Sequence, residues 1–181
     1  YLHVDKEHHT GETCGSVFWA DINHRFIQFF PEEARYADEI EQAIFNAVLA
    51  NQDARGHIRY HCRLQDQKEK ARSINTCCEV MGSAFIASLP QYIYSIAADG
   101  LYINLYAPST ITWEHRGRPV TLTVATQFPF SGKAEIEVRA ASPVPMKVHI
   151  RVPGWTGGQM AVAVNGAAAV TGGAGSYAVL E

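Results

Sequence analysis

The 181-residue sequence has no apolar run of the roughly 18 residues that a membrane-spanning helix needs. It also has no excess of basic residues, because 15 Lys and Arg stand against 18 Asp and Glu, a formal net charge of −3. Nucleic-acid-binding domains usually carry a basic face, so we expect neither a nucleic-acid partner nor a membrane partner. With 47% hydrophobic and 18% charged residues, the composition is typical of a folded chain rather than a disordered one.

The chain begins without an initiator Met and without the apolar core of a secretory signal, since Tyr1 opens a polar segment that includes His8 and His9. We therefore expect that Tyr1 is not the first residue of the natural polypeptide. We interpret the two His as solvated polar residues of a terminal segment, with a role in a sugar subsite as the alternative.

Cysteine is scarce, with four residues at positions 14, 62, 77 and 78. An even number would allow two disulfides in a secreted protein. Cys77 and Cys78 argue against that interpretation, because adjacent cysteines rarely meet the geometry of a disulfide. Reduced thiols at a metal suit the cytoplasm, but bound zinc also protects thiolates in the periplasm, so both compartments stay open.

The first half of the chain, up to residue 98, has mainly helical patterns. Pro31 with the acidic residues after it favours a helix start, and Tyr36, Ile40, Ile44 and Val48 follow at a spacing of four on one helical face. A short strand is expected over residues 57–64. Helical character returns over residues 78–97, where Pro90 should kink or interrupt it.

From residue 99 onward the pattern changes to period two. Apolar and polar residues alternate over 102–106, 120–124, 136–138 and 146–152, and Asn165-Gly166 is a strong signal for a hairpin turn. These short alternating segments predict an antiparallel β-sandwich, which we expect to be incomplete because its last strand runs to the final residue. The predicted fold class is therefore α+β, with helices over 1–98 and a sandwich over 99–181. The helices are too few to close a barrel, so they would leave apolar faces uncovered.

The chemically informative residues are Glu12 and Cys14, which lie far along the chain from Cys77 and Cys78. Three thiolates and a carboxylate are suitable ligands for a tetrahedral zinc site. Cys77 and Cys78 also stand where a helix is expected to begin, and the helix amino terminus favours the thiolate form. Free cysteine is nevertheless among the most buried residue types, so spacing alone leaves a metal site and a set of inert buried thiols both open.

A longer series of motifs resembles the β-L-arabinofuranosidase family, glycoside hydrolase family 127 and its relatives. The motifs occur in this order: Glu12-Thr13-Cys14, Phe18-Trp19, Tyr36 to Asn46, Asn75-Thr76-Cys77-Cys78, Ser88 to Tyr94, Asp99 to Tyr106, Arg151 to Trp155 and Val164-Asn165-Gly166. They extend from about residue 11 to 166, so the resemblance includes both halves of the chain.

The resemblance implies the helical part of an (α/α)6 catalytic barrel followed by a β-sandwich. It implies that Glu12, Cys14, Cys77 and Cys78 bind zinc, and that Cys77 is also the nucleophile of a retaining glycosidase that releases a terminal furanose. It further implies a carbohydrate substrate resembling an arabinofuranoside. The remainder of the catalytic domain, or a second copy of the chain, is the expected protein partner.

The chain also departs from the family pattern. The family's acid/base glutamate precedes the Glu-x-Cys motif, and Glu7 does not match it, so we expect little turnover from these 181 residues alone. Two other hypotheses stay open: a non-catalytic carbohydrate-binding module and a purely structural zinc domain.

Several other residues are interpreted as structural. His57 and His61 could bind metal but more often serve as polar groups of the fold, and Cys62 matches no motif. Trp19 is expected in the helical core, Trp155 in the packing of the sandwich, and the charged segment 66–72 in a solvated loop.

Overall fold

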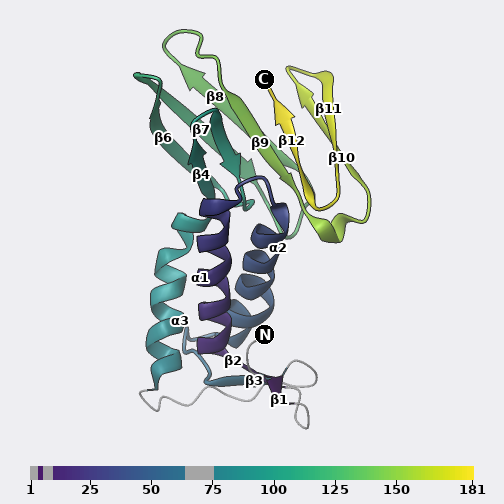
Figure 1. The fold of residues 1–181 in the computed structure, drawn as a ribbon. Coiled ribbons are helices and arrows are strands. Elements are labelled where there is room, and N and C mark those ends of the chain that lie inside the picture. The colour runs from purple at the N-terminus through teal and green to yellow at the C-terminus, as the bar shows by residue number, and fades with distance from the viewer. Residues whose placement is uncertain (1–3, 6–9, 64–75) are drawn as a thin grey trace. The chain divides into compact units, whose positions relative to one another are not determined.

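The structure of the chain is a computed structural model that describes residues 4–5, 10–63 and 76–181. It contains two compact units, Tyr1–Tyr92 and Ile93–Glu181 (Figure 1). The division of domains at residue 98 stays a prediction. His8, His9, Glu7 and the charged segment 66–72 lie outside the described residues. No helix in the described ranges is both long and apolar enough to cross a membrane.

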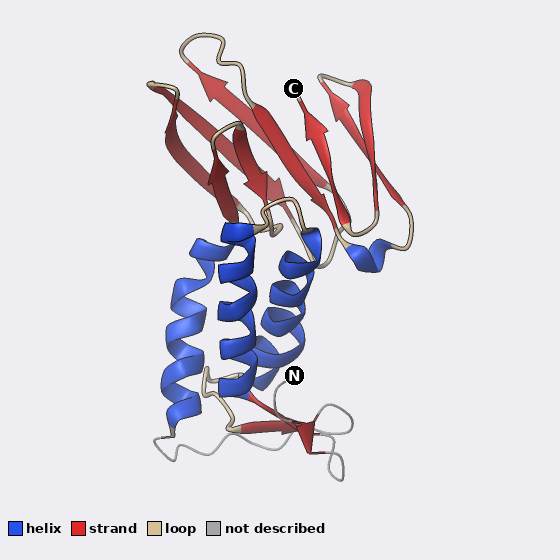
Figure 2. Cartoon of the chain, viewed as in Figure 1, coloured by secondary structure: helices blue, strands red, loops and turns tan. Residues whose placement is uncertain are grey.

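Among its described residues, the first unit contains three α-helices and a small sheet (Figure 2). The helices are α1 (Thr13–Phe29), α2 (Ala34–Gln42) and α3 (Cys77–Ser88). A π-helical segment, Ala43–Val48, and a 3-10 turn, Leu49–Asn51, continue α2. Strands β1 (Val4–Asp5), β2 (Thr10–Glu12) and β3 (His61–Arg63) form an antiparallel sheet in the order β1-β2-β3.

Three of the four residues on the predicted face of the second helix are buried, and the fourth, Tyr36, is half-buried. Ile40, Ile44 and Val48 are at most 5% exposed, although the geometry changes from α to π at Ala43. The helix itself begins at Ala34, after the turn that contains Pro31. On α1, Ala20 is fully buried.

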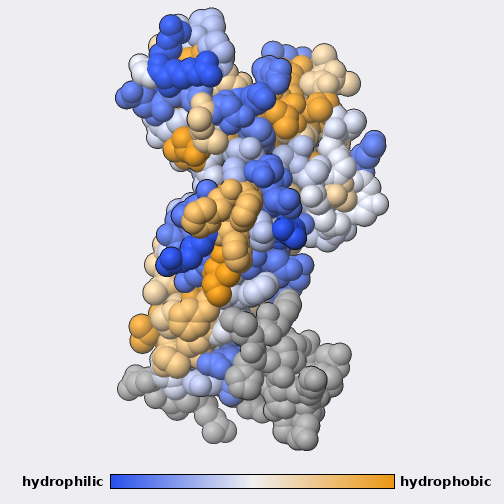
Figure 3. Space-filling model, in the orientation of Figure 1, coloured by the Kyte–Doolittle hydropathy of each residue, from blue (hydrophilic) through white to orange (hydrophobic). Residues whose placement is uncertain are grey.

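Apolar side chains also remain on the surface of the first unit, as Figure 3 shows for one face. On α1 the exposed apolar side chains are Phe18, Ile22, Phe26 and Phe29. Their spacing follows one stripe of the helix. The helical unit therefore does leave an apolar face uncovered.

The expected helix over residues 78–97 is wrong in its last part. The helix ends at Ser88, a 3-10 turn spans Leu89–Tyr92, and residues Tyr94–Ala97 form strand β4. Pro90 has no N–H for a helical hydrogen bond, so the helix cannot continue through it. The residues after it pair with β5 (Gly100–Ile103) across a tight turn. The expected strand over 57–64 begins later than predicted: within the described residues 57–63, His61–Arg63 is the strand and Ile58 forms an isolated bridge with Gln52.

The second unit contains two packed sheets and a hairpin. Strands β9 (Lys147–Val152) and β12 (Ser176–Leu180) join β4 and β5 in a sheet with the order β12-β9-β5-β4. Strands β6 (Ser109–His115), β7 (Arg118–Thr126) and β8 (Ala134–Ala140) form the second sheet, and β10 (Gln159–Val164) pairs with β11 (Ala167–Gly173).

One core joins the two sheets of this unit. Leu101 and Ile150, on β5 and β9, belong to the same buried cluster as Val120 and Leu122 on β7 and Trp113 on β6. Two sheets that share a core form the expected sandwich, and the α+β class is confirmed. The sandwich is not wholly antiparallel, however, because β5 and β9 are parallel. Parallel neighbours need a long crossover, and residues 104–146, which contain the whole second sheet, provide it.

The predicted turn between β10 and β11 is confirmed. Asn165 and Gly166 both have positive φ, 50° and 83°, and Val164 pairs directly with Ala167. Positive φ at both central residues is what a type I′ turn requires, and Asn-Gly adopts it readily.

Candidate metal centre

The structure brings together the four residues that the sequence singles out. One possible ligand atom from each of Glu12, Cys14, Cys77 and Cys78 lies within 4.8 Å of the others. In the part of the chain that the structure describes, no other group of three His, Cys, Asp or Glu side chains is gathered in this way.

Two helix starts and one strand end position these side chains. Glu12 is the last residue of β2 and the N-cap of α1, and Cys14 is the second residue of that helix. Cys77 and Cys78 are the first two residues of α3, as their sequence context predicted. The carboxylate of Glu79 accepts a hydrogen bond from the Thr76 N–H at 3.0 Å and so fixes this helix start.

The sulfur atoms differ in their access to solvent. Cys14 and Cys78 are buried, with 6% and 0% exposed, whereas Cys77 is exposed and Glu12 is half-buried. Cys78 Sγ lies 3.1 Å from Cys14 Sγ and 3.8 Å from Glu12 Oε1. The cluster therefore has a buried pair of sulfurs and one sulfur at the surface.

Burial controls the ionisation of the buried pair. Desolvation raises the pKa of the Cys14 thiol far above its usual range, and the nearby Cys78 raises it further. Desolvation also raises the pKa of Cys78, although its hydrogen bond with Cys14 acts in the opposite direction. Without a cation both thiols would be protonated at neutral pH, and a bound divalent cation would reverse this by stabilising the thiolates.

The donor set fits a zinc ion. In a tetrahedral site with Zn–S bonds of about 2.3 Å and a Zn–O bond of about 2.1 Å, neighbouring donors are about 3.6–3.8 Å apart. The separation of Cys78 Sγ from Glu12 Oε1, 3.8 Å, lies in this range, that of Cys78 Sγ from Cys14 Sγ, 3.1 Å, is shorter, and all four donors are within 4.8 Å. Small side-chain movements are enough for Glu12, Cys14, Cys77 and Cys78 to hold such an ion.

Tyr60 is a neighbour of the cluster that sequence reasoning missed. The negative charge of Glu12 raises the pKa of Tyr60, followed by the charge of Cys77. No sequence motif marks Tyr60, because it reaches Glu12 through the pairing of β3 with β2. It presents a polar hydroxyl beside the carboxylate.

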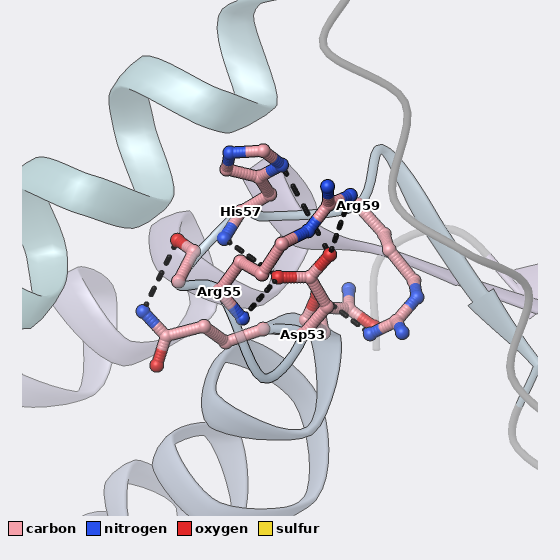
Figure 4. A network of polar contacts seen from close by, with 7 residues as sticks. Asp53, Arg55, His57 and Arg59 are labelled. Carbon is pink, nitrogen blue, oxygen red and sulfur yellow. Dashed lines mark hydrogen bonds and ion pairs between the residues drawn. The ribbon is translucent and has the colours of Figure 1, made fainter.

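The two candidate histidines do not join the cluster. His57 belongs to a turn that Asp53 closes: the Asp53 carboxylate accepts hydrogen bonds from the backbone N–H of Arg55 and of His57 (Figure 4). His61 is exposed and its ring lies edge-on to Tyr60. The side chain of Cys62 lies outside the described part of the chain.

The two tryptophans are placed differently from one another. Trp19 is half-buried, and its indole N–H donates to Glu39 Oε2 at 2.7 Å. These two residues line a small pocket between α1 and α2 together with Ser16, Gln42 and Ala43. Trp155 is 59% exposed and stacks on Phe128, so it covers the surface of the second unit rather than filling its core.

Comparisons with known proteins relate both units to one family. The family model of the GH127 β-L-arabinofuranosidase catalytic domain matches residues 3–91, and that of the GH127 middle domain matches residues 100–181. A curated relative, the non-reducing end β-L-arabinofuranosidase of Bifidobacterium longum subsp. longum, is 25% identical over 178 residues. The alignment covers 88% of this chain and 27% of that protein.

Solved structures agree at the level of the fold. A GH127 β-L-arabinofuranosidase from Geobacillus stearothermophilus T6 superposes with a TM-score of 0.82 at 24% identity, over 98% of this chain and 32% of that chain. A second GH127 β-arabinofuranosidase has a TM-score of 0.77 at 22% identity, over 93% of this chain and 30% of that chain. The chain thus spans about three-tenths of the length of the relatives it matches. With both of its units matched by models of the same family, the chain belongs to glycoside hydrolase family 127 as a piece of the catalytic domain joined to the middle domain.

Proposed function

We propose that this chain carries the metal and nucleophile part of the active site of a retaining β-L-arabinofuranosidase. Glu12, Cys14, Cys77 and Cys78 are the zinc ligands, and Cys77 is also the nucleophile. The substrate is a terminal β-L-arabinofuranoside, the class of sugar in the name of the curated relative.

The observation that carries this proposal is the unequal burial of the three sulfurs. Cys14 and Cys78 are enclosed, so they can hold a metal but cannot meet a sugar. Cys77 is exposed and stands at the first position of α3, where the helix dipole favours a thiolate. A site with structural ligands alone has no need of a solvent-facing sulfur, whereas a nucleophile does.

The reaction proceeds in two displacements at the anomeric carbon. In the first, Cys77 Sγ attacks this carbon, a C–S bond forms, and the bond to the departing oxygen breaks while a general acid protonates that oxygen. In the second, the conjugate base of that acid takes a proton from water as the water oxygen attacks the same carbon, the C–S bond breaks to return the Cys77 thiolate, and the sugar leaves with its original anomeric configuration. A sulfur nucleophile thus replaces the carboxylate that most retaining glycosidases use.

The remaining residues prepare Cys77 for this attack. When bound, zinc supplies a positive charge that keeps thiols deprotonated at neutral pH. Burial of Cys14 and Cys78 keeps solvent from two of the four donors.

Covalent labelling tests the proposal. The protein is incubated with an arabinofuranose-configured epoxide or haloacetamide, and the labelled peptide is identified by mass spectrometry. We expect one label, on Cys77, and no label on the Cys77→Ser variant. A label on another residue of the wild type would overturn the assignment of Cys77.

The same experiment separates the enzyme from a structural zinc domain. A structural site predicts that Cys77→Ser lowers the zinc content without any sugar-dependent labelling in the wild type. An excess of free arabinose should slow the labelling of Cys77 by the sugar-shaped reagent and by iodoacetamide, because a sugar bound at the site covers the sulfur. Labelling by both reagents that arabinose does not slow would show that the site does not recognise the sugar.

A further inference from the structure

The segment 51–60 is bound to the start of α1 by a set of buried hydrogen bonds. The Thr13 hydroxyl donates to the Arg59 carbonyl oxygen at 2.8 Å and accepts from Asn51 Nδ2 at 2.5 Å. The Thr13 backbone N–H donates to the Tyr60 carbonyl oxygen at 3.1 Å. Thr13 and Asn51 are 0% and 1% exposed. One hydroxyl, on the residue between Glu12 and Cys14, therefore joins both ends of this segment.

The segment is itself closed at its base and its tip. At the base, the backbone N–H and Nη1 of Arg59 both donate to the Asn51 carbonyl oxygen at 3.0 Å. At the tip, Asp53 accepts backbone hydrogen bonds from the turn that follows it (Figure 4). These bonds make residues 51–60 a preformed loop rather than a loose connection.

The same loop contacts the helix that carries the other two cysteines. Ile58 is 3% exposed and lies against Gly82 of α3. A Cβ placed on Gly82 would be 2.8 Å from Ile58 Cδ1, 3.0 Å from Ile58 Cγ2 and 3.1 Å from Thr13 Cγ2. Gly82 follows Cys78 by four residues, so both lie on one face of α3. The absence of a side chain at Gly82 thus lets the face that carries Cys78 come close to Thr13.

We propose that Thr13, Asn51, Ile58 and Gly82 are positioning residues for the metal centre: together they act as a brace that sets the distance between the Glu12–Cys14 pair and the Cys77–Cys78 pair. None of the four offers a ligand. The hydrogen bonds of Thr13 and Asn51 fix the start of α1, and the contact between Ile58 and Gly82 fixes how closely α3 approaches it. This inference rests on the proposed metal site, and its test includes a reading that does not depend on metal.

The first test removes the Thr13 hydroxyl. Thr13→Val keeps the shape of the side chain and abolishes both side-chain hydrogen bonds, whereas Thr13→Ser keeps the hydroxyl. In the purified protein we expect Thr13→Val to weaken zinc affinity about tenfold, the loss expected when a buried hydrogen-bonded hydroxyl is removed. Thr13→Ser should stay close to the wild type. Zinc affinity is measured by competition with a chromophoric chelator, and cobalt(II) absorption reports whether the ligand geometry has changed.

The second test pushes the helices apart. Gly82→Ala should weaken zinc affinity and change the cobalt(II) spectrum, because the new methyl group meets Ile58 and Thr13. Ile58→Val removes the nearest of those atoms, so the double variant Gly82→Ala with Ile58→Val should recover part of the affinity. Gly132→Ala, where a new Cβ meets nothing within 4 Å, is the matched control. Circular dichroism shows whether each variant remains folded.

A measurement on the metal-free protein distinguishes the brace proposal from the proposed metal site. In the apo protein, the brace keeps Cys14 and Cys78 enclosed, so Thr13→Val and Gly82→Ala should speed their alkylation by iodoacetamide, measured site by site by mass spectrometry. Faster alkylation in a protein that binds no zinc would support the brace and defeat the proposed metal site. If the wild type binds zinc, and Thr13→Val and Gly82→Ala both keep its zinc affinity, its cobalt(II) spectrum and its rate of alkylation, then the brace proposal is wrong and the proposed metal site is unaffected.

Discussion

Replacing Cys78 by serine should weaken zinc binding strongly while leaving the fold intact. Cys78 has no exposed surface, and its sulfur lies 3.1 Å from Cys14 Sγ and 3.8 Å from Glu12 Oε1. Zinc sites of this type bind with roughly 10–16 kcal/mol, so the loss of one donor of four removes about 3 kcal/mol. That loss corresponds to a dissociation constant about 100-fold weaker.

The effect should also be visible in thermal unfolding. With zinc at about 100 times the wild-type dissociation constant, binding stabilises the folded state by about 2.7 kcal/mol. A 100-fold weaker site loses most of this stabilisation, so for a chain of 181 residues zinc should raise the wild-type Tm by roughly 5–11 °C and the Tm of Cys78→Ser by only about 1–2 °C. Serine is close to cysteine in size, so the two proteins should differ far less in a chelator.

The assay is thermal unfolding with zinc and with chelator, combined with chelator competition for the affinity. Cys62→Ser is the matched control, since the proposed ligand set does not include Cys62. Two results would refute the reasoning. One is a wild-type Tm that zinc does not change, and the other is a Cys78→Ser variant whose affinity equals that of the wild type.

Three further predictions concern the second unit. Gly100→Ala should destabilise it by at least ~3 kcal/mol, because Gly100 has φ +159° and a Cβ there would lie 1.9 Å from the Lys147 carbonyl oxygen. The control variant Gly132→Ala should change the denaturation midpoint little, because a Cβ there meets nothing within 4 Å. Leu122→Ala should cost ~2–5 kcal/mol in urea unfolding, because this side chain is fully buried in the core that joins the two sheets. Burial lowers the pKa of His149 below 6.5 in the folded state, so the unfolded state takes up its proton first as the pH falls. Stability should therefore decrease below about pH 6.5 in the wild type and less so in His149→Phe, measured as the urea midpoint against pH.

A specific experimental result would contradict each of these predictions. A stable Gly100→Ala protein would mean that β5 and β9 are not as close as described. A loss below ~1 kcal/mol for Leu122→Ala would place its side chain outside the core. For His149, Phe keeps a ring against Tyr102, on which the imidazole stacks at 3.9 Å, so packing is preserved. Parallel pH profiles for the two proteins would assign the pH dependence to other groups.

Local features of the fold were predictable where one short segment decides them. Asn165 and Gly166 tolerate positive φ, so their turn could be recognised without any knowledge of the strands' partners. Strand β4 was not recognised, although Pro90 interrupts the helix and the Tyr94 and Ile96 that follow it favour strands. The helical prediction was extended over residues that pair with β5 in the structure. The parallel pairing of β5 with β9 depends on contacts across residues 104–146, which no local pattern encodes.

The candidate site was also predictable only in part, because some of its features depend on contacts between segments that are distant in the sequence. The residue types at 12, 14, 77 and 78 indicated metal chemistry, and motif resemblance identified the family, yet the sequence could not say which sulfur faces solvent. That distinction arises because Cys14 and Cys78 are enclosed while Cys77 is not. Tyr60 was missed for a related reason, since the register of β2 against β3 brings it to Glu12.

The parallel pairing of β5 with β9 has a consequence for synthesis on the ribosome. The hairpin of β4 and β5 leaves the exit tunnel first, but one edge of β5 has no strand to pair with until β9 emerges, after β6, β7 and β8. During that interval Leu101 and Ile103 have no complete core to enter, and an unpaired edge is the kind that recruits other chains. Nascent chains stalled before residue 147 should therefore bind chaperones that recognise apolar strands, and the released 181-residue chain should not bind them.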